Sequence, residues 1–102
     1  MLLTRVLDHL KDADGNPARG KLVIHNPAFI AADGSAVAAG NLTYVIPTSS
    51  PGLVDLMLAP TAGADPPGSR YTVRYFLKSG AQYSETWQIP GSGPITISQA
   101  RA

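Results

Sequence analysis

Alternation of apolar and polar residues predicts two neighbouring β-strands near the middle of the chain. Over residues 70–78, Tyr71, Val73, Tyr75 and Leu77 share one side, and the other side is polar except for Phe76, as on a strand with one buried face. A similar alternation, interrupted by Glu85, returns over residues 82–89, and a short turn at residues 79–81 separates the two runs. The pair therefore predicts a β-hairpin, which Pro90 ends because proline cannot donate a ladder hydrogen bond.

Shorter alternating runs predict further strands over residues 21–25, 42–46, 54–58 and 95–97. Clusters of Gly, Pro, Asn and Asp punctuate the chain between them, at spacings typical of a β-sandwich. We predict an all-β fold in which residues 1–102 form a single sandwich of seven or eight antiparallel strands. The predicted core consists of Leu22, Ile24, Leu42, Tyr44, Ile46, Leu56, Leu58, Tyr71, Val73, Tyr75, Trp87, Ile89 and Ile97.

The first ten residues allow two interpretations. Their leucines and Val6 have the spacing of an apolar helix stripe. The stretch is short for a stable helix, however, and it leads into a hairpin-like turn, so we predict a strand. Asp8 interrupts its alternation between Val6 and Leu10. Residues 1–10 are therefore expected to be an edge strand, wet on one side, or an arm covered by a partner.

Two further segments have weak or no periodicity. Residues 27–40 are mostly small, with alanines around Asp33-Gly34, and predict a weak hairpin with little side-chain packing. Residues 59–69 are rich in Pro, Gly and Ala and predict a loop that crosses the surface.

Composition excludes several classes of function. The net charge is +1, from 8 Lys and Arg against 7 Asp and Glu, so no basic surface for nucleic acid is expected. The chain has no cysteine, which excludes disulfides, thiolate catalysis and Cys-based zinc sites. No long uncharged apolar stretch predicts a membrane span, and charged residues near the start argue against a signal peptide.

Candidate chemical motifs are weak. The run from Asp12 to Asn16 resembles the opening of a calcium loop, but the required later Glu is missing, and a tight turn is the better interpretation. His9 and His25 are too few for a usual metal site and are expected to be polar strand positions. Gly91-Ser92-Gly93 lacks the strand–turn–helix context of a nucleophile elbow. We therefore expect no catalytic residues, no cofactor and no bound metal.

Tyr83, Glu85 and Trp87 share one face of the second hairpin strand, and two interpretations stay open. If that face is buried, Trp87 is a core residue and Glu85 needs a donor such as Arg74 or a backbone N–H. If it is exposed, the two rings form a strip that suits a sugar or a protein interface.

The order of these signals resembles a known kind of module. The pattern comprises Asp14-Gly15-Asn16-Pro17-Ala18-x-Gly20, Leu22-x-Ile24, Asp33-Gly34, Gly40, Pro51-Gly52, Leu56-x-Leu58-x-Pro60, Gly68-x-x-Tyr71-x-Val73-x-Tyr75, Glu85-x-Trp87-x-Ile89-Pro90 and Ile95-x-Ile97. It is similar to the small immunoglobulin-like or transthyretin-like β-sandwiches of bacteriophage structural proteins. Related modules accompany secreted bacterial enzymes, so fold alone does not decide the function.

The resemblance implies a non-enzymatic virion protein of the neck, tail or fibre attachment, assembled in the bacterial host cytoplasm. Its implied partners are portal, neck, tail, capsid or fibre proteins and further copies of itself as a homo-oligomer, with neither nucleic acid nor membrane. The alternative is a carbohydrate-binding or accessory module of a bacterial surface or secreted protein. The expected contact segments are residues 1–10, 27–40 and 59–69. The candidate interaction surface consists of Leu3, Leu7, Phe29, Ile30, Tyr83 and Trp87.

Overall fold

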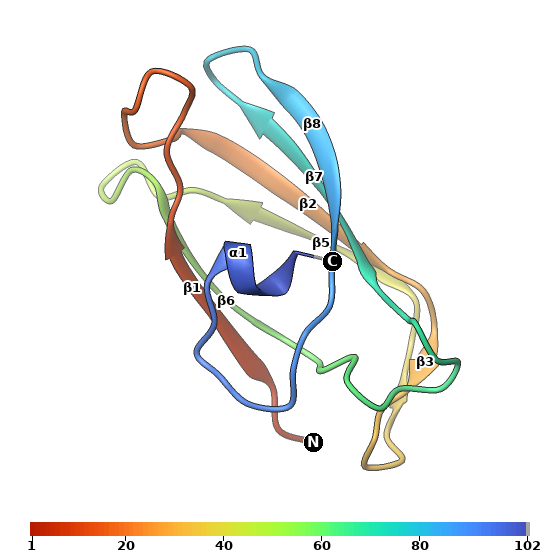
Figure 1. Cartoon of the computed structure of the whole chain (residues 1–102). Helices are drawn as coiled ribbons and strands as arrows, with labels where there is room; N and C mark the ends of the chain where they lie inside the picture. Colours follow the sequence, from red (N-terminus) through yellow and green to blue (C-terminus); the bar gives the residue numbers. More distant parts are fainter. Residues whose placement is uncertain (102) are drawn as a thin grey trace.

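The computed structural model describes residues 1–101, and the chain is all-β, with 47% of its residues in strands (Figure 1). All ladders between the eight strands are antiparallel, as the sequence pattern predicts. The elements are β1 (Thr4–His9), β2 (Gly20–Asn26), β3 (Phe29–Ile30), β4 (Ala36–Val37), β5 (Gly40–Val45), β6 (Leu53–Leu58), β7 (Tyr71–Leu77), β8 (Gln82–Trp87) and the helical turn α1 (Ile97–Ala100).

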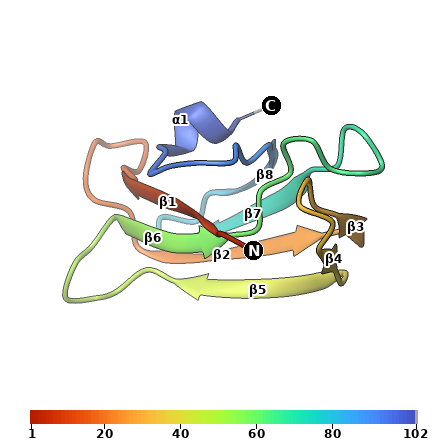
Figure 2. The ribbon, with the colours of Figure 1, turned by 90° about the horizontal axis from the view of Figure 1, so that it is seen from below.

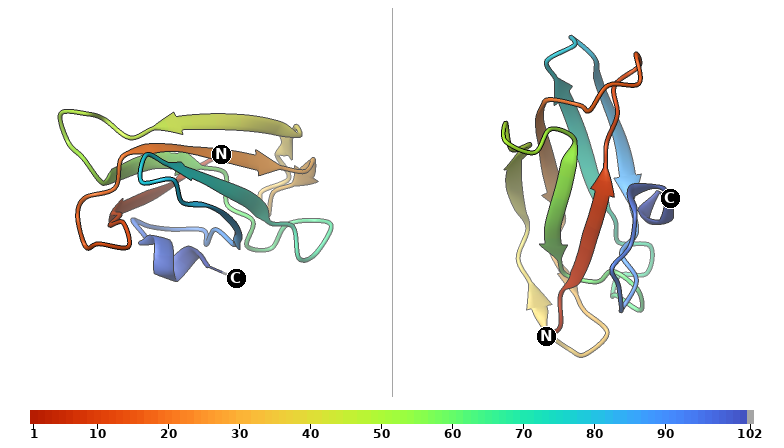
Figure 3. Two further views of the ribbon diagram at one scale, coloured as in Figure 1. Left: turned by 90° about the horizontal axis from the view of Figure 1, so that it is seen from above. Right: turned by 90° about the vertical axis from the view of Figure 1, so that its left-hand side faces the viewer.

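The strands form two layers and one small appendage (Figures 2 and 3). A four-stranded sheet in the order β5-β2-β7-β8 faces a two-stranded sheet of β1 and β6. The appendage is the β3–β4 hairpin at one end of the molecule. The arrangement is that of a β-sandwich whose second layer is narrower than the first.

Side chains from the facing sides of both layers form the main core. Trp87, Tyr75 and Leu22 are fully buried on the larger sheet, and Val6 and Val54 are fully buried on the smaller one. The alternation predicted for β7 holds in full, since its odd-numbered residues are buried and its even-numbered residues face outward.

The first residues form a strand, β1, and the helical alternative is wrong. Asp8 interrupts the apolar alternation because its side chain bonds to a distant part of the chain. Its Oδ2 accepts a hydrogen bond from the Ile97 N–H, at 3.0 Å, where α1 begins. β1 pairs with β6 on one side, and on the other the Leu7 N–H donates to the Ile95 carbonyl at 2.9 Å. Backbone on both sides therefore flanks β1.

The strand predicted over residues 95–97 does not form. Ile95 makes only an isolated bridge to Val6, and Ile97 starts α1. The local reason is a capping box, in which the Thr96 side chain accepts from the Gln99 N–H and the Gln99 side chain accepts from the Thr96 N–H. Ile97 is buried as predicted, but it reaches the core from a helical turn.

Leu42 is predicted in the core and is instead 43% exposed. The predicted side of the strand is correct, because Leu42 shares the inner face of β5 with Tyr44. A four-stranded sheet cannot be covered by two strands across its full width, and β5 is the outermost strand on its side. Tyr44 is only partly buried for the same reason.

A backbone junction ties the two layers together at the end opposite the β3–β4 hairpin. Leu10 N–H donates to the Gly52 carbonyl at 2.7 Å, and Gly52 N–H donates to the Ala18 carbonyl at 2.8 Å. Gly52 has a φ of +81°, and a Cβ there would lie 2.6 Å from the Leu10 oxygen. Glycine is therefore required at this junction for both its conformation and its lack of a side chain.

Candidate interaction surface

Three segments that are distant in sequence meet at one end of the molecule, where the N-terminus, the β3–β4 hairpin and the loop of residues 59–69 lie together (Figures 1 and 3). Ile30 and Asp65 exchange two backbone hydrogen bonds, of 2.8 and 2.9 Å, which join the hairpin to the loop. The Met1 amino group lies 3.9 Å from Asp33 in the hairpin turn. These are the segments that the sequence predicts as contact segments.

Phe29 anchors this end to the main core. Its ring packs edge-on against Tyr71, with centroids 6.4 Å apart, and it is 3% exposed. Ala31, Ala59 and Ala64 complete a small second core beneath the hairpin. The Tyr71 hydroxyl donates to the Ala59 carbonyl at 2.8 Å and so fixes the start of the loop. The hairpin is short, but it is held by packing as well as by its ladder.

The exposed side of this end is apolar, and we call it the apolar end: Met1, Leu2, Leu3 and Ile30 together with the alanines around them. Leu2 is 84% exposed, Leu3 46% and Ile30 43%. A hollow of about 580 Å³ lies beside Ile30, and a separate hollow of about 230 Å³ lies beside Met1 and Leu2. Hydrogen bonds from the side chain and then the backbone N–H of Ser35 hold the pKa of Asp33 below its usual value. This carboxylate therefore stays charged opposite the Met1 amine.

The structure separates the six residues that the sequence assigns to one surface. Leu3 and Ile30 lie exposed at the apolar end, while Leu7 is half-buried on the outer side of the smaller sheet. Tyr83 is 41% exposed on β8, away from them.

Two of the six assigned residues are not on a surface. Phe29 is buried because neighbouring residues on a strand point to opposite sides, so only one of Phe29 and Ile30 can face solvent. Trp87 is buried between the layers, which decides the open alternative in favour of the core.

Glu85 lies on the inner side of β8 and is the centre of a polar network. It accepts hydrogen bonds from the Tyr75 hydroxyl and from Trp87 Nε1, and its Oε2 lies 2.5 Å from Arg101 Nε. Within residues 1–101, the donors are thus Tyr75, Trp87 and Arg101, and neither Arg74 nor a backbone N–H. Burial, followed by the bond to Glu85, raises the pKa of Tyr75. Tyr83 stacks on Tyr75 with ring centroids 4.3 Å apart, so one exposed ring covers the network.

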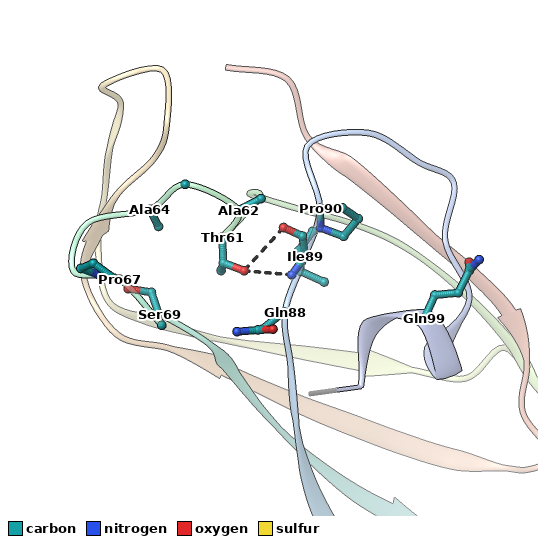
Figure 4. Close-up of a pocket in the computed structure, with 11 residues that line it drawn as sticks. Thr61, Ala62, Ala64, Pro67, Ser69, Gln88, Ile89, Pro90 and Gln99 are labelled. Atoms are coloured by element: carbon teal, nitrogen blue, oxygen red, sulfur yellow. Dashed lines mark hydrogen bonds between the residues drawn. The ribbon is translucent and has the colours of Figure 1, made fainter.

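A hollow of about 660 Å³ lies between the 59–69 loop and the residues after β8 (Figure 4). The Thr61 hydroxyl accepts a hydrogen bond from the Ile89 N–H at 2.9 Å and holds the loop against the segment that follows β8. Gln88, Gln99 and Ser69 supply the other polar side chains, and none of the eleven lining residues is ionisable. The hollow can hydrogen-bond a ligand but offers no general acid or base.

The remaining motifs have structural explanations. Asp12 Oδ1 accepts from the N–H groups of Asp14 and Asn16, which is the predicted tight turn. His9 and His25 lie in different sheets, and His25 Nδ1 is 2.9 Å from Asn41 Oδ1. Within residues 1–101, no group of three or more His, Asp and Glu is placed to hold a metal ion. No helix of the described chain has the length and apolarity needed to cross a membrane.

Comparisons with protein-family models, with curated proteins and with solved structures find no match for this chain.

Proposed function

We propose that this protein is a non-enzymatic structural or adaptor component of a bacteriophage virion, which joins other subunits at the neck, tail or fibre attachment. One observation carries the assembly role: the N-terminus, the β3–β4 hairpin and the 59–69 loop converge on the apolar end. Exposed apolar residues that occur singly need no explanation, whereas a cluster of them is typical of an interaction site.

The composition of the apolar end suits a protein partner. Charged residues are depleted at the centres of protein interfaces. Here the amine of Met1 and the carboxylate of Asp33 lie opposite each other, and Asp65 is the other ionisable residue along the hollows. A partner that covers Leu2 and Ile30 would therefore bury few uncompensated charges.

The phage setting comes from the sequence resemblance. The modules that the chain resembles are small β-sandwiches in virion proteins, and an all-β chain of this size agrees with that setting. The proposed partners are portal, neck, tail, capsid or fibre subunits, and the proposed place of assembly is the host cytoplasm. The immunoglobulin-like or transthyretin-like type of the sandwich belongs to the same proposal.

The carbohydrate alternative requires an exposed strip formed by Tyr83 and Trp87. Trp87 is fully buried, so Tyr83 is left without its neighbouring ring as a stacking platform. We therefore do not favour sugar binding.

Incorporation into particles tests the proposal. A tagged chain is expressed in the host during growth of the phage that carries the gene, and purified particles are analysed by mass spectrometry. We expect the chain in the particles at a fixed ratio to other structural proteins. Particles that lack the chain would contradict the virion role.

A pair of variants tests the apolar end itself. Ile30→Gln should reduce incorporation about tenfold, because it removes an apolar side chain from the proposed contact. Met57→Gln is the matched control, since Met57 is 48% exposed on the outer side of β6 and Ile30 is 43% exposed. Equal incorporation of both variants would remove the apolar end as the contact.

A further inference from the structure

The outer edge of β5 carries unpaired backbone groups. The Ile46 N–H donates to the Gly20 carbonyl at 3.0 Å, which sets the phase of the antiparallel ladder between β5 and β2. Because bonded and non-bonded pairs alternate along such a ladder, the backbone N–H and C=O groups of the even-numbered residues of β5 point toward β2. The N–H and C=O groups of Asn41, Thr43 and Val45 therefore point away from the sheet, and no residue of the described chain bonds to them.

Both outer edges of the smaller sheet are covered in part. At β6, the Tyr44 hydroxyl donates to the Leu53 carbonyl at 2.8 Å and accepts from the Asp55 N–H at 3.3 Å. At β1, the Ile95 N–H donates to the Arg5 carbonyl at 2.9 Å. A side chain and a backbone segment thus occupy groups that would otherwise template another strand.

The other edge of the larger sheet, at β8, is partly covered and is also charged. The Gln88 N–H donates to the Ala100 carbonyl at 2.8 Å, and Trp87 bridges to Arg101. Glu85 places a carboxylate on the inner side of the same strand. An inward-pointing charge is one of the devices by which proteins discourage edge pairing.

β5 has none of these devices. Its residues Gly40–Val45 include no charged side chain and no proline, and Thr43, Tyr44 and Val45 are of types enriched in strands. Leu42 is 43% exposed and Val45 is 64% exposed. An uncharged edge strand with unpaired backbone groups and exposed aliphatic side chains is a template for addition of a further strand.

We propose that a second copy of this chain fills this edge, with the two β5 strands antiparallel about a two-fold axis at Thr43. This inference rests on the proposed assembly function and identifies the contact that forms its homo-oligomer. The two-fold places Thr43 opposite its own copy and Asn41 opposite Val45, and each facing pair exchanges both backbone hydrogen bonds. The two four-stranded sheets then form one continuous sheet of eight strands.

The strand is complementary to itself in this register. On the inner side, Leu42 of each copy faces Tyr44 of the other, which covers the leucine that the second layer leaves exposed. On the outer side, the central pair is Thr with Thr, a favourable cross-strand pair. Self-pairing brings no like charges together, since β5 carries none. A copy of the same chain therefore fits this edge, because the edge has no charge that a partner would have to neutralise.

The experiment uses opposite charges at the two-fold position. The full-length protein should show concentration-dependent dimerisation by sedimentation velocity. Thr43→Lys and Thr43→Glu should each weaken it about tenfold, because two like charges then face each other. An equimolar mixture of the two variants should restore dimers, which native mass spectrometry identifies as heterodimers. Circular dichroism confirms that each variant keeps the strand content of the parent.

Ser84→Lys and Ser84→Glu are the matched controls. Ser84 is an exposed residue of β8 whose backbone groups also point to a free edge, since Arg74 and Ser84 alternate with the bonded pairs of the β7–β8 ladder. These variants should dimerise as the parent does. Loss of dimers in the Ser84 variants, or no recovery on mixing the Thr43 variants, would overturn the proposed contact.

The failure of this inference differs from the failure of the proposed function. A chain that stays monomeric at every concentration overturns the self-pairing of β5. If that monomer is still incorporated into particles through the apolar end, the virion role stands. If dimers form as described but the chain is missing from particles, the β5 contact stands and the virion role does not.

Discussion

The two outer strands of the larger sheet, β5 and β8, have the same position in the topology and different surroundings. β8 is packed beneath by Trp87, is joined to the C-terminal residues, and holds Glu85 in a network with Tyr75 and Arg101. β5 is exposed along most of its length and carries no charge. This sandwich therefore covers part of one edge with its own chain and leaves the other edge open to a further strand.

Truncation of an inward residue should change the free energy of unfolding far more on β8 than on β5. Trp87→Ala should lower the free energy of unfolding by about 3–5 kcal/mol, because it leaves a large cavity in the core. Leu42→Ala should cost only about 1 kcal/mol, since Leu42 is 43% exposed. Chemical denaturation of both variants under dimer-free conditions checks the contrast. Equal losses would mean that β5 is covered as well as β8.

The next effect concerns the network that closes β8. Glu85→Ala should cost about 2–3 kcal/mol, because it leaves the Tyr75 hydroxyl and the Trp87 N–H without their acceptor. Arg101→Ala should cost less than about 1 kcal/mol, because the Arg101 side chain is 51% exposed. Urea denaturation measures both. A larger loss from Arg101→Ala than from Glu85→Ala would show that the ion pair, and not the buried donors, holds the edge.

Ionisation of the tyrosines should have the smallest effect at neutral pH, because it changes the free energy of unfolding only at alkaline pH. Burial raises the pKa of Tyr71 to about 12, and burial also raises the pKa of Tyr75 and of Tyr83. An unfolded tyrosine titrates near pH ~10, so the unfolded chain loses these protons first as the pH rises. The stabilisation is therefore fully present below that pH and is lost above it, toward the pKa values of the folded state.

Denaturation at a series of alkaline pH values checks this dependence. All three tyrosines lie in β7 and β8, so the alkaline loss belongs to the closed side of the sheet. Tyr75→Phe should make the decline of stability with pH shallower, because one ionisable group is removed. A decline of unchanged slope in that variant would show that Tyr75 does not contribute.

The sequence predicts the exposure of some residues of the interaction surface correctly and of others wrongly. It gives residues 1–10, 27–40 and 59–69 as expected contact segments, and the structure brings parts of all three to the apolar end, where Leu3 and Ile30 are exposed. It also assigns Phe29 and Trp87 to a surface, and both are buried. Periodicity tells which residues share a side of a strand but not which side another layer covers. For Phe29 the sequence does contain a usable signal. Neighbouring residues on a strand point to opposite sides, so Phe29 and Ile30 cannot both face solvent.

Residues alone determined the all-β class, the β7–β8 hairpin and most of the core, because period-two alternation and turn residues act over a few positions of the chain. Tertiary structure decided what lies at the edges. Tyr44 covers β6, Ile95 covers β1, Ala100 and Arg101 cover part of β8, and β5 stays open. These contacts join residues far apart in sequence, so their presence depends on how the layers are placed and not on any local pattern.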